Sequence, residues 1–264
     1  MNAKRVLLIN DICCFGKASI TVSLPLLSAM GIECVLLPTA VLSTHTGGLG
    51  KPVITDMSES MLQTAEHFQQ LNLSFDAIYV SYLANEEQVE LVKTILSMLK
   101  GENTIVFYDP AMADEGKLYS GFDLSFVEKV KELCKAADVI LANQTEAEYL
   151  SGNRENVIEK LREEGIYADI VLKGERKEYG KIRNIYACED GRIFDEHTYL
   201  EGHFHGTGDV FASVLIGCLL TGVNKENALK KAGEVTYRCV KKSIEEGIDE
   251  RYGLPIEDMI KEGL

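Results

Sequence analysis

The residues best suited to chemistry form a short run near the C-terminal end of the chain. Gly206, Thr207 and Gly208 precede the carboxylate of Asp209, and an apolar helical stretch follows from Val210. Because glycine lacks a Cβ, such a turn can aim backbone N–H groups at an anion, and the positive end of a helix favours the same anion. An acidic side chain beside a phosphate-binding turn favours phosphoryl transfer with Asp209 as the base. A simple helix cap is the alternative interpretation.

Polar groups also follow several predicted strands. They are Asn10-Asp11, Asp109-Pro110, Asn143 and Lys173-Gly174. In an open α/β sheet the ligand crevice lies outside the carboxyl ends of the strands, so we expect these groups to meet there. Mg²⁺ prefers oxygen ligands and keeps several waters, which suits Asp109, Asn143 and Glu146 acting around a hydrated ion. The sequence therefore predicts a metal–nucleotide site.

Each of these residues also has an ordinary structural explanation. Asp109 before a proline is a typical turn residue, and Asn143 or Thr145 could cap the helix that contains Glu146. Lys173 could be a solvated loop charge. Their joint placement at one sheet edge favours a site over four independent structural roles.

The elements that must position these residues alternate between strand-like and helical patterns, which indicates βαβ units and a mainly parallel sheet. We expect strands at 5–10, 34–37, 77–80, 104–108, 139–142 and 170–173. We expect helices at 18–30, 58–71, 86–99, 124–136, 156–164, 210–220 and 225–245. Pro25 should kink or break the first helix. Residues 182–198 should add an antiparallel pair at the sheet edge, with a turn at Asp190-Gly191.

The composition fits one domain spanning residues 1–264, with 46% hydrophobic residues. A formal charge of −14 disfavours binding to nucleic acid and to anionic membranes. No apolar stretch reaches the length of a membrane span, and the N-terminus leads directly into a predicted strand, so we expect a cytoplasmic protein. The seven cysteines include no CxxC pair and should be reduced thiols.

The chain resembles the ribokinase-like superfamily and, within it, the pyridoxal (pyridoxamine) kinases of vitamin B6 salvage. Seven segments, in order and over nearly the whole chain, carry the resemblance. They are NDICCFGKASITVSLPLLSAMG (10–31), LPTAVLSTHTGG (37–48), YVSYLANEEQV (79–89), YDPAMADEGKLY (108–119), ANQTEAEYLSG (142–152), VLKG (171–174) and HFHGTGDVFAS (203–213). The resemblance implies a three-layer α/β/α fold without a separate β lid domain. It also implies a homodimer that phosphorylates the 5′-hydroxymethyl group of a B6 vitamer with ATP and Mg²⁺, and K⁺ or Na⁺ as a further candidate.

The same resemblance assigns roles to individual residues. It makes Asp209 the catalytic base, which also contacts the substrate, and Gly206, Thr207 and Gly208 the anion hole. It places Asp109, Asn143, Glu146 and Lys173 at the nucleotide, with Asp109 and Glu146 contacting magnesium through water. It places Asp11, Thr46, Gly47 and Tyr82 around the pyridine ring. We expect residues 111–121, with Gly116 and Gly121 as hinges, to cover the site.

Three positions depart from the family pattern. Asp11 stands where many pyridoxal kinases have Ser, which leaves the preferred vitamer open. Ala113 replaces a common Gly in the cover, and Thr44 replaces Asn before His45. A buried, hydrogen-bonded histidine and a ligand contact are both compatible with His45. Cys13 and Cys14 receive no functional role.

Other functions remain open at this point. A hydroxymethylpyrimidine or hydroxymethylpyrimidine-phosphate kinase shares the fold and the glycine turn, although such enzymes typically carry Cys where this chain has Asp209. A non-catalytic sensor would bind ATP or a vitamer without releasing ADP. A sugar or nucleoside kinase would usually add a β-stranded lid, for which residues 11–50 leave little room.

Overall fold

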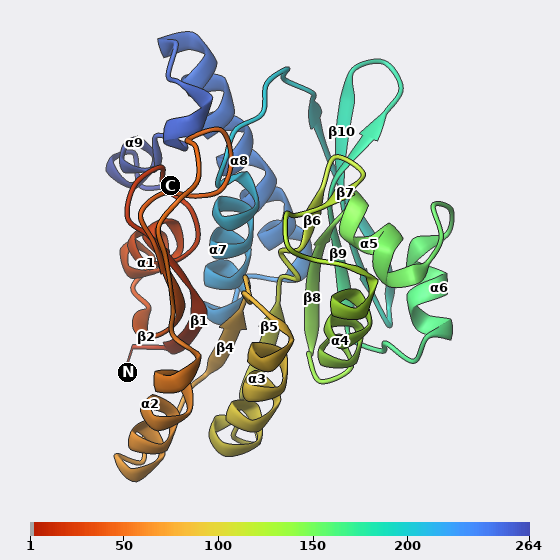
Figure 1. Ribbon diagram of the computed structural model, residues 1–264. Coiled ribbons are helices and arrows are strands. Elements are labelled where there is room, and N and C mark those ends of the chain that lie inside the picture. Colours follow the sequence, from red (N-terminus) through yellow and green to blue (C-terminus); the bar gives the residue numbers. More distant parts are fainter. Residues whose placement is uncertain (1–2) are drawn as a thin grey trace.

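A nine-stranded sheet forms the middle layer of the computed structural model, which describes residues 3–264 (Figure 1). Its strands are β1 (Arg5–Cys13), β2 (Glu33–Leu42), β3 (Ile54–Asp56), β4 (Ala77–Val80), β5 (Ile105–Tyr108), β8 (Val139–Asn143), β9 (Asp169–Lys177), β10 (Lys181–Cys188) and β11 (Gly191–Thr198). The spatial order is β11-β10-β9-β8-β5-β4-β1-β2-β3. The six strands from β9 to β2 are parallel, and antiparallel strands complete both edges.

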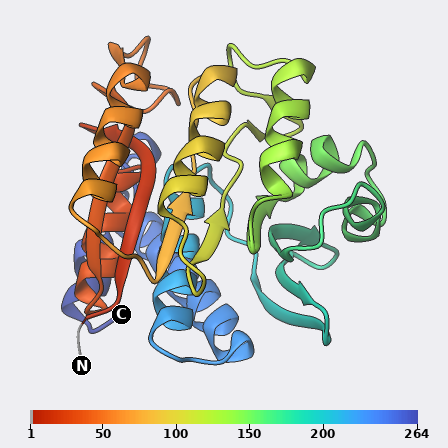
Figure 2. The ribbon, with the colours of Figure 1, turned by 90° about the horizontal axis from the view of Figure 1, so that it is seen from below.

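Helices cover both faces of this sheet (Figure 2). One face carries α2 (Ser58–Gln70), α3 (Glu86–Leu99), α4 (Leu124–Cys134), α5 (Gln144–Ser151) and α6 (Val157–Glu163). The other carries α1 (Ile20–Ala29), α7 (Thr207–Leu220), α8 (Lys225–Glu246) and α9 (Ile256–Lys261), with the 3₁₀ turn η1 (Glu250–Tyr252) before α9. Because strand side chains alternate, Leu7 and Ile9 of β1 enter one core while Val6 and Leu8 enter the other. The result is the expected three-layer α/β/α architecture.

The expected strands and helices are all present, but several boundaries differ. β1 continues through Asn10-Asp11 to Cys13, and β9 continues past Lys173-Gly174, so neither pair ends a strand. The hairpin turn lies one residue earlier than expected, because Cys188 pairs with Gly191 around a two-residue loop. Pro25 lies inside α1 without breaking it, since the helix packs Leu26 and Leu27 into the core on the next turn.

Short elements without a strong periodic pattern were missing from the sequence interpretation. They are β3, α9, η1 and the hairpin of β6 (Ala113–Asp114) with β7 (Lys117–Leu118). The last of these shapes the segment expected to cover the site. Among residues 3–264, no helix is both long and apolar enough to cross a bilayer.

Candidate active site

The glycine turn forms the N-terminal end of α7, a fourteen-residue helix. Gly206 is the N-cap residue, with a left-handed φ of 84°, and no side chain in the described part of the chain caps the helix. The first helical hydrogen bond runs from the Val210 N–H to the Gly206 carbonyl. The N–H groups of residues 206–209 therefore have no partner within the helix, and the expected set 206–208 is among them. An uncapped helix start with the positive end of its dipole exposed is suited to an anion.

Asp209 lies in the first turn of α7, partly buried, and faces the same space. Its Oδ2 accepts a hydrogen bond from the Ser19 backbone N–H at 2.9 Å. Burial raises the pKa of Asp209 to about 7; the Ser19 bond opposes this rise, and Asp109 and Asp11 add to it. A carboxyl group with a pKa near neutrality is a much better proton acceptor than an ordinary aspartate.

The loop that supplies Ser19 is locked against the glycine turn. Lys17 and Ser19 both have positive φ angles, 41° and 58°, which are unfavourable for residues with side chains. A Cβ on Gly206 would lie 2.7 Å from the Lys17 carbonyl oxygen, so only glycine permits this approach. Lys17 is also bound to the C-terminal segment, through the Leu254 carbonyl and Glu257. The contact from Ser19 could not be found in the sequence, because any residue except proline supplies a backbone N–H.

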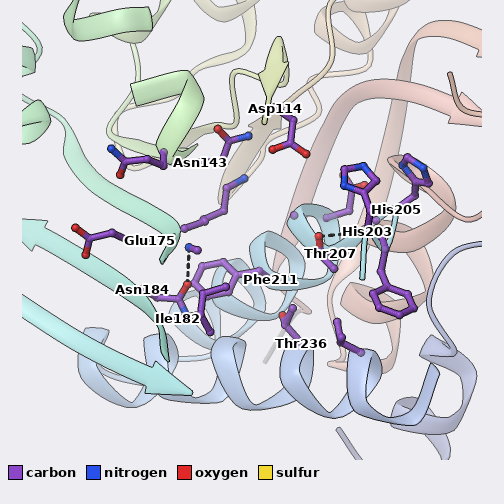
Figure 3. Close-up of a pocket in the computed structure, with 18 of the residues that line it drawn as sticks. Asp114, Asn143, Glu175, Ile182, Asn184, His203, His205, Thr207, Phe211 and Thr236 are labelled. Atoms are coloured by element: carbon purple, nitrogen blue, oxygen red, sulfur yellow. Dashed lines mark hydrogen bonds between the residues drawn. The ribbon is translucent and has the colours of Figure 1, made fainter. Parts of the chain in front are cut away.

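A cleft of about 900 Å³ opens in front of this turn (Figure 3). It brings together all the residues expected at the catalytic centre and at the nucleotide. They are Asp109, Asn143, Glu146, Lys173, Gly206, Thr207, Gly208 and Asp209. The cleft continues between the β10–β11 hairpin and α8, where Asn184, His197 and Tyr237 line it.

Lys173 and Asp109 form a buried ion pair, with 2.5 Å between Nζ and Oδ2. Burial opposes the charge on Lys173, but the carboxylates of Asp109 and Glu146 outweigh it, and the pKa of Lys173 lies above its ordinary value. A Cβ on Gly208 would be 3.5 Å from Lys173 Nζ, so the ammonium group lies directly beside the anion turn. Lys173 is therefore not a solvated loop charge.

A β-bulge directs the Lys173 side chain toward Asp109 and the anion turn. Ile185 pairs with Leu172 and Arg183 with Glu175, so Lys173 and Gly174 together face the single residue Asn184. Gly174 has a φ of 71°, which suits a glycine at the irregular position. Local sequence shows the glycine but not the strand register that makes it a bulge.

Asn143 and Glu146 form a capping box at the start of α5. The Glu146 N–H donates to Asn143 Oδ1, and the Asn143 N–H donates to Glu146 Oε2, each at 2.8 Å. Asn143 Nδ2 donates to the Ala113 carbonyl, so this side chain also anchors the segment above the cleft. Burial and the nearby Asp109 raise the pKa of Glu146 above its ordinary range. The capping interpretation of Asn143 is confirmed, and a direct nucleotide contact stays a prediction.

The expected substrate residues lie outside the cleft-lining set but approach the same turn. Asp11 is buried, its Oδ1 has no hydrogen-bond partner within residues 3–264, and burial raises its pKa to about 6. Tyr82 lies near it, since the Asp11 charge adds to burial in raising the pKa of Tyr82. Gly47 lies against His205, whose ring would be 2.0 Å from a Cβ at residue 47. Thr46 is exposed.

Two histidines, His45 and His205, pack beside Gly47. His45 is buried, and both its ring nitrogens are engaged, Nδ1 by the Gly47 N–H and Nε2 by the Arg251 carbonyl. This bonding favours the structural interpretation of His45 over a ligand contact. His205 packs on His45 at 4.1 Å between ring centroids, and burial with the neighbouring histidines lowers the pKa of His205 to about 4. His205 is thus a neutral packing residue, which its place in the glycine motif did not reveal.

The segment 111–121 folds over α5 as the β6–β7 hairpin. Glu115 and Gly116 form its tip, both with positive φ. The Gly116 N–H donates to Thr145 Oγ1 at 3.0 Å, which ties the tip to the helix that carries Glu146. Glu115 also meets His203 across the cleft, at 3.4 Å.

The donor set fits a hydrated magnesium ion held mainly by a nucleotide. Residues 3–264 contain no group of three His, Cys, Asp or Glu side chains placed to hold a metal. Asp109 and Glu146 use Oδ2 and Oε2 in the hydrogen bonds described above, which leaves the second oxygen of each for a metal-bound water. All seven cysteines, which lie within the described residues, are free thiols.

The parallel sheet, the uncapped helix start and the lysine–carboxylate cleft define a phosphotransferase of the ribokinase-like fold. The model of the phosphomethylpyrimidine kinase family matches residues 14–253, and the chain belongs to that family. The chain is 26% identical to the pyridoxal kinase PdxY of Rubrobacter xylanophilus, over 93% of this chain and 90% of that protein.

Crystal structures show the same relationship. The pyridoxal kinase of Lactobacillus plantarum superimposes with a TM-score of 0.91 at 29% identity, covering 100% of this chain and 97% of that one. A Bacteroides thetaiotaomicron protein, provisionally named a phosphomethylpyrimidine kinase and crystallised with pyridoxal, gives a TM-score of 0.93 at 27% identity, covering 99% and 96%. The predicted family and fold are therefore confirmed.

Proposed function

We propose that this protein transfers the γ-phosphoryl group of ATP to the 5′-hydroxymethyl group of a vitamin B6 vitamer. The observation that carries the proposal is the placement of Asp209, a carboxylate with a pKa near 7, in the first turn of an uncapped helix and in one cleft with Lys173. The relatives named pyridoxal kinase supply the substrate class. We further propose that the protein is cytoplasmic, that its chain forms one domain and that two copies form a homodimer.

In the proposed reaction, the triphosphate lies along the cleft with its terminal phosphate at the α7 turn. The N–H groups of residues 206–208 and the Lys173 ammonium stabilise charge on the transferring group, and they are in place before the reaction begins. The Asp209 carboxylate orients the substrate hydroxyl and takes its proton as the new P–O bond forms, while ADP leaves with the bond electrons.

Magnesium fits this arrangement for an electrostatic reason. Carboxylates outnumber cations among the described residues that line the cleft, where Lys173 and Arg176 carry the positive charge, and the cleft must accept a polyanion. A magnesium ion bound with the nucleotide would neutralise phosphate charge, with Asp109 and Glu146 holding its waters. Lys173 lies directly beside the anion turn, so its ammonium group would meet phosphate oxygens while Asp109 and Glu146 hold those waters. A requirement for K⁺ or Na⁺ remains part of the proposal to be tested.

The substrate ring is proposed to lie near Asp11, Thr46, Gly47 and Tyr82. The unpartnered Asp11 Oδ1 needs a donor, which a ring hydroxyl, a protonated ring nitrogen or an amine can supply. The family description keeps a second candidate in view, since hydroxymethylpyrimidine also carries a primary alcohol, a ring nitrogen and an amino group. Asp209 at the position that is typically Cys in those kinases favours the vitamer.

One experiment ranks these candidates. ADP release would be measured with pyridoxal, pyridoxine, pyridoxamine and hydroxymethylpyrimidine in parallel, with product phosphorylation followed by mass spectrometry. We expect a B6 vitamer to give the highest kcat/KM. A preference for hydroxymethylpyrimidine would support the second candidate, and ligand binding without ADP from any substrate would support a sensor.

A further inference from the structure

A chain of hydrogen bonds connects the far end of the cleft to the bulge at Lys173. The Gly174 N–H donates to Asn184 Oδ1 at 3.0 Å, the bond drawn at Asn184 in Figure 3. Asn184 Nδ2 then donates to Asp195 Oδ2 at 3.1 Å, and His197 Nε2 meets the same oxygen at 2.9 Å. Asn184 and Asp195 are 7% and 8% exposed, so these are buried polar groups rather than surface contacts.

Neighbouring helix α8 is shaped around this network. A Cβ on Gly233 would lie 2.0 Å from Asp195 Oδ2 and 2.7 Å from His197 Nε2, so the network fits only beneath a glycine. His197 stacks on Tyr237 of the same helix, at 5.4 Å between ring centroids and 19° between ring planes. The side chains are therefore held from both the hairpin and the helix.

This buried polar network is an unusual use of a sheet edge. Within residues 3–264, Asp195 has His197 and no lysine or arginine as its ionic partner, and a buried aspartate of this kind is unfavourable unless hydrogen bonds compensate. The position of Asn184, at the end of the network nearest Lys173, explains why such a network is present. Asn184 fills the bulge, and the bulge sets the direction from which Lys173 reaches Asp109 and the anion turn.

We propose that Asn184, Asp195 and His197 are positioning residues that act through the Gly174 bulge to hold Lys173 at the phosphate end of the cleft. This inference rests on the proposed function, because it needs a phosphate ligand for Lys173. The network touches no reacting atom. It fixes the backbone from which the lysine extends, and a small error there displaces the ammonium group.

Asp195 offers a matched pair of variants for the test. Both Asp195→Ala and Asp195→Asn remove the charge, but an asparagine oxygen in place of Oδ2 can still accept from Asn184 and His197. We expect Asp195→Ala to weaken ATP binding and lower kcat by about tenfold each, the effect of losing roughly 1.4 kcal/mol. Asp195→Asn should remain within about threefold of the unsubstituted enzyme.

Binding of adenosine separates positioning from other roles. Adenosine lacks phosphates, so its dissociation constant, measured by calorimetry beside that of ATP, should change less than twofold in Asp195→Ala. An equal loss for ATP and adenosine would mean that the network is only a wall for the nucleoside, and an unchanged ATP affinity would mean that it is only structural. Either result overturns the proposal.

A double-mutant cycle with Lys173→Ala tests the route of the effect. If the network acts through Lys173, then Asp195→Ala should weaken ATP binding little further once the lysine is gone. Full additivity contradicts the proposal. If Asp195→Ala does not fold, Asn184→Ala removes the link at the bulge and carries the same expectations. An unsubstituted protein that binds ATP but phosphorylates no vitamer would refute the proposed function while leaving this binding cycle intact as a test.

Discussion

The two sides of the α7 turn treat their carboxylates differently. On the nucleotide side, Asp109 is buried and paired with Lys173, and Glu146 is tied into a capping box. On the acceptor side, Asp11 and Asp209 form no ion pair within residues 3–264, and burial raises their pKa values to about 6 and about 7. Burial raises the pKa of Glu146 as well, so the two sides differ in the partners of their carboxylates and not in the direction of the pKa shift. Paired charges suit the binding of a charged ligand, whereas an uncompensated carboxylate suits the acceptance of a proton.

The contrast also shows how the chain tolerates the uncompensated side. The only hydrogen bond to the Asp209 carboxylate in the described part of the chain comes from Ser19, whose own backbone is unfavourable. Close packing of Gly206 on Lys17 holds that loop in place. The unfavourable backbone of Ser19 and the buried carboxylate of Asp209 both lower the stability of the protein. Both lie where the proposed chemistry requires a base.

The largest expected effect comes from removing the base. Asp209→Asn should lower kcat by roughly 10²–10⁴, the range for a positioned proton acceptor, while ATP binding persists. Asp114→Asn is the matched control, because it removes the same charge from another cleft-lining position. Steady-state kinetics and ATP calorimetry would measure both variants. A kcat for Asp209→Asn within a few fold of the unsubstituted enzyme would assign Asp209 another role.

Removing the cation tests the paired side. Lys173→Ala should weaken ATP binding and slow turnover by roughly 10–100-fold, because hydrogen bonds to charged groups contribute about 1.5–3 kcal/mol. Lys177 lies on the same strand and pairs with Glu175 at 3.4 Å, but among the described residues it is not part of the cleft lining, so Lys177→Ala should behave as the unsubstituted enzyme. Equal effects of the two substitutions would indicate a general loss of positive charge rather than a specific contact.

Thermal unfolding should show opposite signs on the two sides. Asp109→Asn leaves the Lys173 ammonium buried without its partner and should destabilise the protein by about 3 kcal/mol. Asp209→Asn should stabilise it by about 1 kcal/mol above pH 7, because asparagine can still accept from Ser19 without an unfavourable charge.

The pH dependence of this stabilisation has a defined direction. The pKa of Asp209 is about 7 in the folded protein and about 3.8 in the unfolded chain. The folded state therefore binds more protons than the unfolded state between these two pH values. Stability of the unsubstituted protein therefore falls as pH rises through this window. The gain from Asp209→Asn should disappear below about pH 4, and a gain that is the same at every pH would contradict the raised pKa.

Much of this site could be predicted from the sequence. Asp109, Asn143 and Lys173 were recognised because parallel strands deliver their ends, or irregularities near them, to one sheet edge, and Asp209 because glycines precede an apolar helix. The sequence could not show that Lys173 extends from a bulge, because the bulge exists only in the register of β9 with β10. Ser19 was invisible because its contribution is a backbone N–H in a rare conformation.

The raised pKa of Asp209 should also appear in the kinetics. The base must be ionised, so kcat/KM for the vitamer should fall about tenfold per pH unit below pH 7 and level off above it. Vitamers titrate in the same range, so pyridoxal and pyridoxine would be compared. If the fall in kcat/KM has the same midpoint with both vitamers, the titrating group belongs to the enzyme. A midpoint near 4 would mean that the pKa of Asp209 is ordinary in the enzyme before the vitamer binds.

The smallest expected effect concerns how the nucleotide side is closed. Thr145→Val keeps the side-chain shape but removes the acceptor for the Gly116 N–H, so the hairpin tip loses its bond to α5. Loss of one such bond is worth about 1 kcal/mol, which predicts a KM for ATP about fivefold higher. ADP release without a vitamer should rise by a similar factor, because a looser cover admits water to the phosphate.

Thr94→Val is a suitable control, since the Thr94 hydroxyl bonds within α3 on an exposed surface. If ADP release without a vitamer and the KM for ATP are both unchanged in Thr145→Val, the hairpin does not act as a cover. Water must then be excluded from the acceptor side of the turn.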